Sequence, residues 1–371
     1  MRHEITFYQL GNADSCRIAL ANGQQLLFDY ANMRDASNSE DRRADLPRLL
    51  REALGARKAF DVVAFTHADN DHVCGAAMFF YLNHNRAYQD DSRIRITEIW
   101  VPAAFILESR NDLTADARAI QAEARYRLIQ GHGIRVFSRP DRLATWLTNH
   151  NVRPSDRAHL IVDAGKLVPG FTRGGQGVEF FVHSPFAHRL DDGSLIDRND
   201  CSLVLQATFE TLSDPVRLML TADTTHDILS ELIGITRAHG NDERLRWTVF
   251  KLPHHCSYLS LSAEKGKYET TPDKPIAWLL EAQGERHGII VSTSDPIPTG
   301  DTDQPPHLQT ARYYRRIAGE RPYQFIVTME HPTARSPEPL VITIDHTGAT
   351  PQQRNRSSSA YVTGRPAPRA G

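Results

Sequence analysis

The segment that most constrains this chain is Thr66-His67-Ala68-Asp69-Asn70-Asp71-His72, which follows the mostly apolar run at residues 60–65. Short valine-rich runs of this kind are typical of buried strands, and the loop after a strand can turn its side chains toward one point. Imidazole and carboxylate groups together suit zinc, manganese or iron. We therefore predict a metal site at this strand end, with a solvated acidic loop as the alternative interpretation. The candidate ligands are His67, Asp69, Asp71 and His72.

Three further apolar runs, at residues 178–182, 218–221 and 249–252, end close to residues of the same kind. Adjacent side chains diverge, so a single cluster cannot enclose two ions, and ligands must also come from distant strand ends. The repeated pattern predicts that the fold brings four strand ends together. Two alternatives stay open, because His183 is one of 17 histidines and an Asp after a strand is also a common helix N-cap. The candidates here are His183, Asp223 and the pair His254–His255.

The order of the expected elements indicates an α/β protein with two packed sheets and helices on the outer faces. Residues 139–176 are expected to be an irregular insertion in a single domain of residues 1–346. Residues 347–371, rich in Ser, Arg, Pro and Gly, are expected to be a disordered tail. Expected strands lie at residues 5–10, 16–21, 25–30, 60–65, 94–101, 134–138, 178–183, 202–209, 216–221, 247–252, 276–280, 288–292, 323–329 and 340–344. Expected helices lie at residues 38–54, 73–81, 115–130, 225–233 (with Gly234 as the stop signal) and 307–318.

The ligand order resembles that of the metallo-β-lactamase fold superfamily, in which an HxHxDH segment precedes a distant His, an Asp and a final His. Within it, the chain is most similar to the hydrolase domain of the ComEC competence proteins and their stand-alone relatives, which carry HxDxDH as residues 67–72 do. The resemblance covers roughly residues 5–344 and implies a metallo-β-lactamase αββα sandwich of two mixed β-sheets flanked by helices. Three more segments carry it: Gly11-Asn12-Ala13-Asp14-Ser15, Asn199-Asp200-Cys201-Ser202-Leu203-Val204-Leu205 and Lys251-Leu252-Pro253-His254-His255-Cys256-Ser257.

This resemblance implies two divalent ions, zinc or manganese, with Asp223 as a bridging ligand. Asp71 and His254 are expected to be catalytic, His254 either by protonating the leaving group or by replacing His255 as the ligand. Asp29 would steady a ligand histidine or its loop from behind. The remaining ligands would be divided between one ion held by His67, Asp69 and His183 and another held by Asp71, His72 and His255.

The sequence departs from the family pattern at three places. Cys256 and Ala222 stand where the family usually has glycine, and Phe28-Asp29-Tyr30-Ala31 stands where an Asp-x-Gly turn is common. No departure removes a ligand. A side chain at a position that glycine normally fills can crowd the loop, so the loop near His255 is where the geometry is least certain from sequence.

The expected function is that of a binuclear metal-dependent hydrolase, either a phosphodiesterase or a nuclease, that attacks its substrate with a hydroxide bridging the two ions. A phosphodiester is anionic and suits two cations. Two alternatives are hydrolysis of a small ester, lactone or thioester, and a partner-dependent subunit of a bacterial system such as antiviral defence. Residues expected to bind the substrate are Asn199, Ser202, Ser257 and Tyr258, with Arg173 and Arg198 as candidate phosphate contacts.

Composition adds mainly exclusions. The net charge of -2 gives no global signal for nucleic acid or membrane. The four cysteines are widely spaced without a CxxC motif, which does not indicate a disulfide scaffold or a zinc ribbon. There is no signal-peptide apolar region and no run near the roughly 18 apolar residues of a membrane helix. We expect a reduced, cytoplasmic protein without membrane association, whose partners are nucleic acid or another phosphodiester, and a second protein.

Overall fold

The computed structural model describes residues 2–109, 111–191 and 197–352. In these ranges a nine-stranded sheet has the order β17-β16-β1-β2-β3-β4-β5-β6-β7. Every strand pair from β3–β4 to β6–β7 is parallel. Every pair from β17–β16 to β2–β3 is antiparallel. Its strands are β1 (His3–Phe7), β2 (Cys16–Ala19), β3 (Gln25–Phe28), β4 (Ala59–Ala64), β5 (Arg95–Pro102), β6 (Ile134–Phe137), β7 (Ile161–Val162), β16 (Leu340–Asp345) and β17 (Gly348–Pro351).

A second sheet has six strands in the order β13-β12-β11-β10-β9-β8, and a small hairpin joins β14 (Pro332–Thr333) to β15 (Ser336–Pro337). The strands from β10 to β13 are parallel, and β8 and β9 are antiparallel to their neighbours. Both sheets are therefore mixed. The strands are β8 (Val178–Ser184), β9 (Val204–Phe209), β10 (Val216–Leu220), β11 (Trp247–Lys251), β12 (Gly284–Ser292) and β13 (Gln324–Val327).

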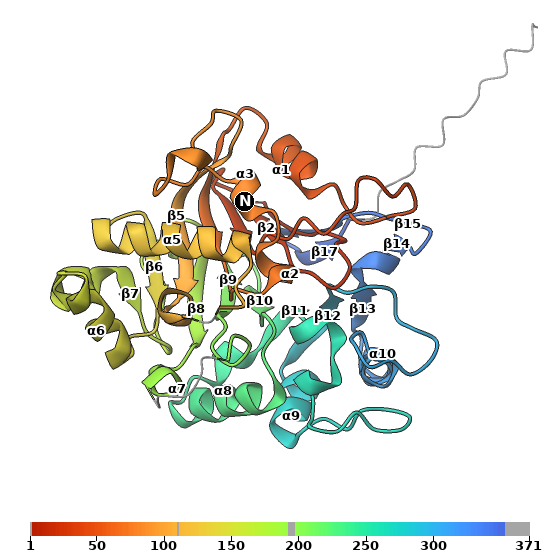
Figure 1. The fold of residues 1–371 in the computed structure, drawn as a ribbon. Coiled ribbons are helices and arrows are strands. Elements are labelled where there is room, and N and C mark those ends of the chain that lie inside the picture. The colour runs from red at the N-terminus through yellow and green to blue at the C-terminus, as the bar shows by residue number, and fades with distance from the viewer. Residues whose placement is uncertain (1, 110, 192–196, 353–371) are drawn as a thin grey trace, which may run out of the picture.

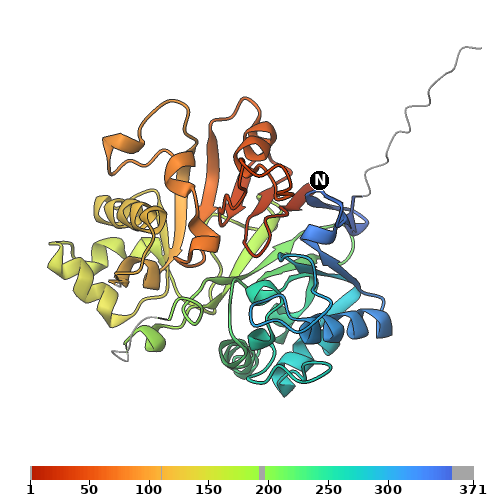
Figure 2. The ribbon, with the colours of Figure 1, turned by 45° about the vertical axis from the view of Figure 1, so that its right-hand side comes forward.

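The helices cover the two outer faces (Figures 1 and 2). α1 (Leu46–Leu54), α3 (Ala76–Phe79), α4 (Ala103–Leu107) and α5 (Ala115–Gln130) pack on the first sheet, and α8 (His226–Ala238), α9 (Lys274–Ala282) and α10 (Leu308–Glu320) pack on the second. A separate apolar core lies between the sheets, because alternate strand residues face it. The predicted αββα sandwich is confirmed. The remaining helices are α2 (Asn70–Val73), α6 (Asp141–Asn149) and α7 (Ala187–Asp191).

The strand predicted at residues 276–280 is wrong, because this segment belongs to helix α9. Its buried residues Ile276, Leu279 and Leu280 recur at helical spacing, and Pro275 lies in the first turn, where its missing N–H costs nothing. The predicted stop at Gly234 is also wrong, since α8 continues to Ala238. An isolated glycine lowers helix propensity, but packing of the apolar face outweighs it.

Two expectations about domain limits need correction. Residues 139–176 are not irregular throughout, because they contain α6 and the edge strand β7, which pairs with β6. The tail expected from residue 347 is wrong for Gly348–Pro351, which forms β17 and pairs with β16. Backbone pairing holds this strand although it buries little apolar surface. Residues 353–371 of the expected tail lie outside the described residues.

Candidate metal centre

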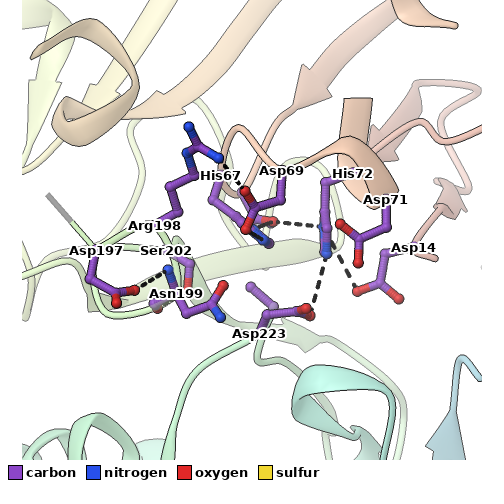
Figure 3. Close-up of polar contacts among 12 residues, drawn as sticks. Asp14, His67, Asp69, Asp71, His72, Asp197, Arg198, Asn199, Ser202 and Asp223 are labelled. Atoms are coloured by element: carbon purple, nitrogen blue, oxygen red, sulfur yellow. Dashed lines mark hydrogen bonds and ion pairs between the residues drawn. The ribbon is translucent and has the colours of Figure 1, made fainter. Parts of the chain in front are cut away.

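Most of the predicted ligands lie where strands of both sheets end, and Figure 3 shows His67, Asp69, Asp71, His72 and Asp223 together. The segment from His67 to His72 follows β4, and its last residues form the first turns of α2. Asp223 follows β10, and His255 lies in the short helical turn Pro253–Cys256 after β11. One potential ligand atom from each of four residues lies within 4.8 Å of the others. We call Asp71, His72, Asp223 and His255 the four-ligand cluster.

The spacing inside the four-ligand cluster fits a shared ion. Asp223 lies between the two rings, with Oδ1 3.3 Å from Nε2 of His72 and Oδ2 3.3 Å from Nε2 of His255. Nε2 of His255 is also 3.1 Å from Oδ2 of Asp71. Two atoms bound to one ion at roughly 2.0–2.2 Å lie about 3.0–3.5 Å apart. The separations therefore match those of atoms that ligate the same cation.

Asp29 contacts the ring of His72 directly and reaches that of His67 only through Thr66. Nδ1 of His72 donates to Oδ2 of Asp29 at 2.9 Å. Thr66 Oγ1 donates to the same oxygen at 2.7 Å and lies 3.1 Å from Nδ1 of His67. A histidine that donates through Nδ1 presents a lone pair on Nε2, as a metal ligand must. Asp29 thus contacts His72 in the way the sequence predicted.

The third ring is anchored by the backbone. Nδ1 of His255 donates to the carbonyl oxygen of Thr293 at 2.8 Å, which again leaves Nε2 for the cluster. Nε2 of His67, Nε2 of His72 and Oδ1 of Asp223 are buried without a hydrogen-bond partner among the described residues. Buried polar atoms nearly always have partners. These three atoms therefore fit a bound cation, which would satisfy them.

Electrostatics also make the cluster a strong cation site. Burial disfavours the charged form of His255, but the negative charge of Asp223 outweighs burial and raises the pKa of His255 to about 10. The balance is the same for His72, whose pKa is well above its usual value. Burial would raise the pKa of Asp223, yet His255 and His72 hold it well below its usual value. The carboxylates thus demand positive charge, from protons or from a metal ion.

Sequence reasoning missed the role of Lys251. This buried ammonium forms an ion pair with Asp14, donates to the carbonyl oxygen of Ala222 at 3.0 Å and lies 3.8 Å from Oδ1 of Asp223. A buried charge must be paired, so Lys251 and Asp14 depend on each other. The available signal was a lysine at the end of an apolar strand just before the histidine pair, together with an Asp in the turn that follows β1.

The backbone around the centre is strained. Asp29, Ala222, His254, His255 and Cys256 all have φ between 47° and 64°, a left-handed region that suits glycine. Ala222 and Cys256 are the positions where the family usually has glycine. Each such residue costs roughly 1–2 kcal/mol, and strain of this kind gathers at functional sites.

The structure places His183 away from the centre, which corrects the ligand set. Strand residues alternate between faces, so His183 shares the outer face of β8 with Phe181, and the two rings lie 4.9 Å apart. Its Nε2 donates to the carbonyl oxygen of Arg244 at 3.0 Å, and its Nδ1 lies 3.3 Å from Thr236 Oγ1 on α8. Burial lowers the pKa of His183 to about 4, so the ring is neutral.

Of the two neighbouring histidines, His255 is the one placed to be a metal ligand. Its ring reaches Asp71 and Asp223, whereas the ring of His254 lies 6.3 Å from it and outside the four-ligand cluster. Burial lowers the pKa of His254, and its Nδ1 is buried without a hydrogen-bond partner in the described residues. His254 is therefore not one of the four clustered ligands, and the proton donation expected of it stays a prediction.

The four expected substrate contacts separate into two pairs. Ser202 and Ser257 are buried, and their hydroxyls bond within their own loops, to the Asn199 carbonyl oxygen at 2.8 Å and to the Leu259 N–H at 3.3 Å. These hydroxyls stabilise the loops, and their expected role in substrate binding stays a prediction. Asn199 lies beside the centre in Figure 3, and Tyr258 is half-buried with its ring 5.0 Å from that of His307.

Both expected phosphate contacts are already held by carboxylates. Arg173 pairs with Glu210 at 2.9 Å. Arg198 donates to Asp69 Oδ1 at 2.6 Å, and Oδ2 of Asp69 lies 3.6 Å from Nε2 of His67. Asp69 is therefore near the centre but is engaged by a cation of the chain.

No protein-family model matches this sequence, and no curated protein matches it significantly. Among solved structures, the chain is similar to a new diphosphatase from the PhnP family, with 11% identity over 92% of this chain and 98% of that one and a TM-score of 0.36. It is similar to unliganded yeast PDE1, with 10% identity over 88% and 97% and a TM-score of 0.43. A β-lactamase from Chitinophaga pinensis shares 11% identity over 66% and 76%, with a TM-score of 0.29. These likenesses are too distant to say what this chain does.

None of the described helices combines the length and the apolar character that a membrane-spanning helix requires. The cytoplasmic location expected from the sequence stays a prediction.

Proposed function

We propose that this chain is a metal-dependent hydrolase of the ComEC-like branch of the metallo-β-lactamase fold, and that its substrates are phosphodiesters. One observation carries the proposal: His67, His72 and His255 are each held through Nδ1, by Thr66, Asp29 and Thr293, with Nε2 left for the aspartates. Nitrogen and oxygen ligands of this kind suit zinc or manganese. A divalent ion in the four-ligand cluster would lower the pKa of a water molecule and polarise a phosphoryl oxygen.

Other residues of the chain would orient the ligands and transfer a proton. Asp29 and Thr293 fix the orientation of the ligand rings, and Asp223 bridges the rings of His72 and His255. His254 lies next to the cluster, and donation of a proton to the leaving oxygen is the role proposed for it. Burial lowers the pKa of His254, so its ring would have to gain a proton before it could act as this acid.

A basic cleft favours phosphodiesters over small esters. A cleft of about 450 Å³ lies between the segment before α1 and the β14–β15 hairpin. Guanidinium groups bind phosphate oxygens well, but Arg43 and Arg48 of the cleft also pair with carboxylates, those of Asp41 and Glu52. The cleft is lined by Arg34, Arg42, Arg43, Arg48 and Arg335, together with Asp41, Asp45 and Glu338.

The proposal is tested with purified protein, stripped of metal and reloaded with manganese or zinc. Bis-p-nitrophenyl phosphate, single- and double-stranded DNA, RNA and a lactone are offered in turn. We expect phosphodiester turnover that requires metal and is lost in Asp71→Asn but kept in Asp61→Asn, whose side chain lies on β4 away from the centre. Turnover of the lactone alone would favour the small-ester alternative. No metal-dependent turnover of any substrate would contradict a hydrolase and leave the partner-dependent subunit, which is otherwise an untested expectation.

A further inference from the structure

Among the described residues, Asp69 is the one predicted ligand that pairs with an arginine. Nη1 of Arg198 donates to Oδ1 of Asp69 at 2.6 Å, and Figure 3 shows Arg198 on one side of Asp69 and the ring of His72 on the other. The same guanidinium binds Glu108 Oε1 through Nε at 2.8 Å and Asp112 Oδ1 through Nη2 at 2.7 Å. An arginine keeps its charge at all physiological pH values. Asp69 is therefore neutralised without a metal ion.

The guanidinium of Arg198 is anchored mainly by Glu108. The side chain of Glu108 is only 2% exposed and that of Arg198 12% exposed, whereas Asp69 is 33% and Asp112 52% exposed. Charged pairs shielded from water are screened less than surface pairs, and removal of one partner leaves the other buried. A metal ion at Asp69 would have to displace or repel a guanidinium that three carboxylates hold in place.

The other ligand expected beside His67 and Asp69 is also missing from this position. His183 was expected to complete that set, but its Nε2 is 3.0 Å from the Arg244 carbonyl oxygen on the outer side of β8. A first site would therefore retain only His67 and the bridging Asp223, with Asp69 engaged by Arg198. Catalytic zinc sites normally have three protein ligands, so this half of the centre is incomplete.

The four-ligand cluster shows the opposite situation. Its two aspartates and two histidines contact one another, and no guanidinium of the described residues pairs with Asp71 or Asp223. The nearest cation, Lys251, is 3.8 Å from Oδ1 of Asp223 and forms its ion pair with Asp14. Four ligands are enough to hold one divalent ion.

We infer that this chain binds a single divalent ion, in the four-ligand cluster, and that the guanidinium of Arg198 takes the place of a second ion beside His67 and Asp69. The inference rests on the proposed function, because it assumes that the four-ligand cluster binds metal. Arg198 is a positioning residue in this arrangement, since it fixes Asp69 and closes the incomplete half of the centre.

The test counts bound ions on the full chain. Protein stripped with a chelator is titrated with Mn²⁺, and separately with Zn²⁺, by calorimetry, and the bound metal is measured by elemental analysis after dialysis. We expect one equivalent in the unmodified protein. In Arg198→Gln, Asp69 becomes free, and a second, weaker equivalent is expected. Arg217→Gln is the matched control, because Arg217 is similarly shielded, pairs with Glu285 at 3.1 Å and lies at the far end of β10; it should bind one equivalent.

A second variant keeps the test decisive if Arg198→Gln fails to fold. Asp69→Asn should keep one equivalent with affinity within about threefold of the unmodified protein, whereas Asp71→Asn should lose about 100-fold or more. Two equivalents of similar affinity in the unmodified protein, or a large loss of affinity in Asp69→Asn, would overturn the inference and leave the proposed function intact. Absence of any bound metal would overturn both.

Discussion

Asp29 and His72 are joined by a 2.9 Å hydrogen bond from Nδ1 of the ring to Oδ2 of the carboxylate, and both residues are buried. Oδ1 of Asp29 accepts the Thr66 N–H at 2.7 Å, so the same side chain also fixes the start of the ligand segment. The carboxylate of Asp29, directly after β3, thus sets the tautomer of the His72 ring and fixes the start of the loop that carries this ring.

Asp29→Asn should therefore weaken metal binding while leaving all the ligands in place. The amide would turn an N–H toward Nδ1 of His72 and favour the wrong tautomer, and loss of such a partner typically costs about 10–100-fold in metal affinity. Calorimetric titration with Mn²⁺ or Zn²⁺ measures the change. Asp61→Asn, which also removes a carboxylate that accepts a backbone N–H, should leave the affinity unchanged. Equal affinities for both variants would show that Asp29 does not orient the ring.

Lys251→Met should destabilise the metal-free protein strongly. The substitution leaves Asp14 buried without its ion-pair partner, and breaking a buried pair typically costs about 3–5 kcal/mol. Urea denaturation in the presence of a chelator measures the free energy of unfolding. Adding Asp14→Asn to Lys251→Met should restore more than half of the loss, and Lys58→Met at an exposed site should have no effect. A double variant as unstable as the single one would contradict the pairing.

Ala222→Gly should stabilise the protein. Ala222 has φ of 47°, and relief of a side chain in the left-handed region is worth about 1 kcal/mol. Ala207→Gly is the matched control in the middle of β9, where φ is not positive and glycine should cost about 1 kcal/mol. Thermal and urea unfolding measure both. If both variants were destabilised alike, the strain assigned to Ala222 would be absent.

Glu123 should give the protein an acid-sensitive stability that does not involve the metal centre. Burial would raise the pKa of Glu123, but hydrogen bonds from His84 and the charge of Arg127 outweigh burial and lower this pKa to about 2. Its unfolded value is 4.5, so the stabilisation is present above pH 4.5 and is lost as the pH falls through 2. The loss is about 3 kcal/mol by linkage.

Unfolding free energies measured by urea between pH 7 and pH 2.5 test this expectation. Glu123→Gln should be less stable at pH 7 and should show a flatter pH dependence than the unmodified protein. Glu52→Gln, on the exposed face of α1, should follow the unmodified curve. A Glu123→Gln curve parallel to the unmodified one would show that Glu123 is not a source of acid sensitivity.

Features that depend on neighbours in the sequence were predictable. Helix α5 was predicted at residues 115–130 and spans Ala115–Gln130, because Thr114 caps its N-terminus and Gly131, with φ of 86°, ends it. The strands before the ligand positions were predictable from their apolar runs, and so was the αββα class. His67, Asp69, Asp71 and His72 were found from local spacing alone, since four ligand-type residues in six positions need no distant information.

Only the tertiary structure decided which predicted ligands meet. A shift of one residue along a strand moves a side chain to the opposite face of the sheet. A register shift lies between Val182 and Ser184, where His183 was expected to face the centre. The pairing of Arg198 with Asp69 joins residues 129 positions apart, and the pairing of Lys251 with Asp14 joins two different sheets. Such contacts depend on how distant segments of the chain pack together. The sequence therefore determined the residue types of the centre, and packing determined which of them are free to bind a metal ion.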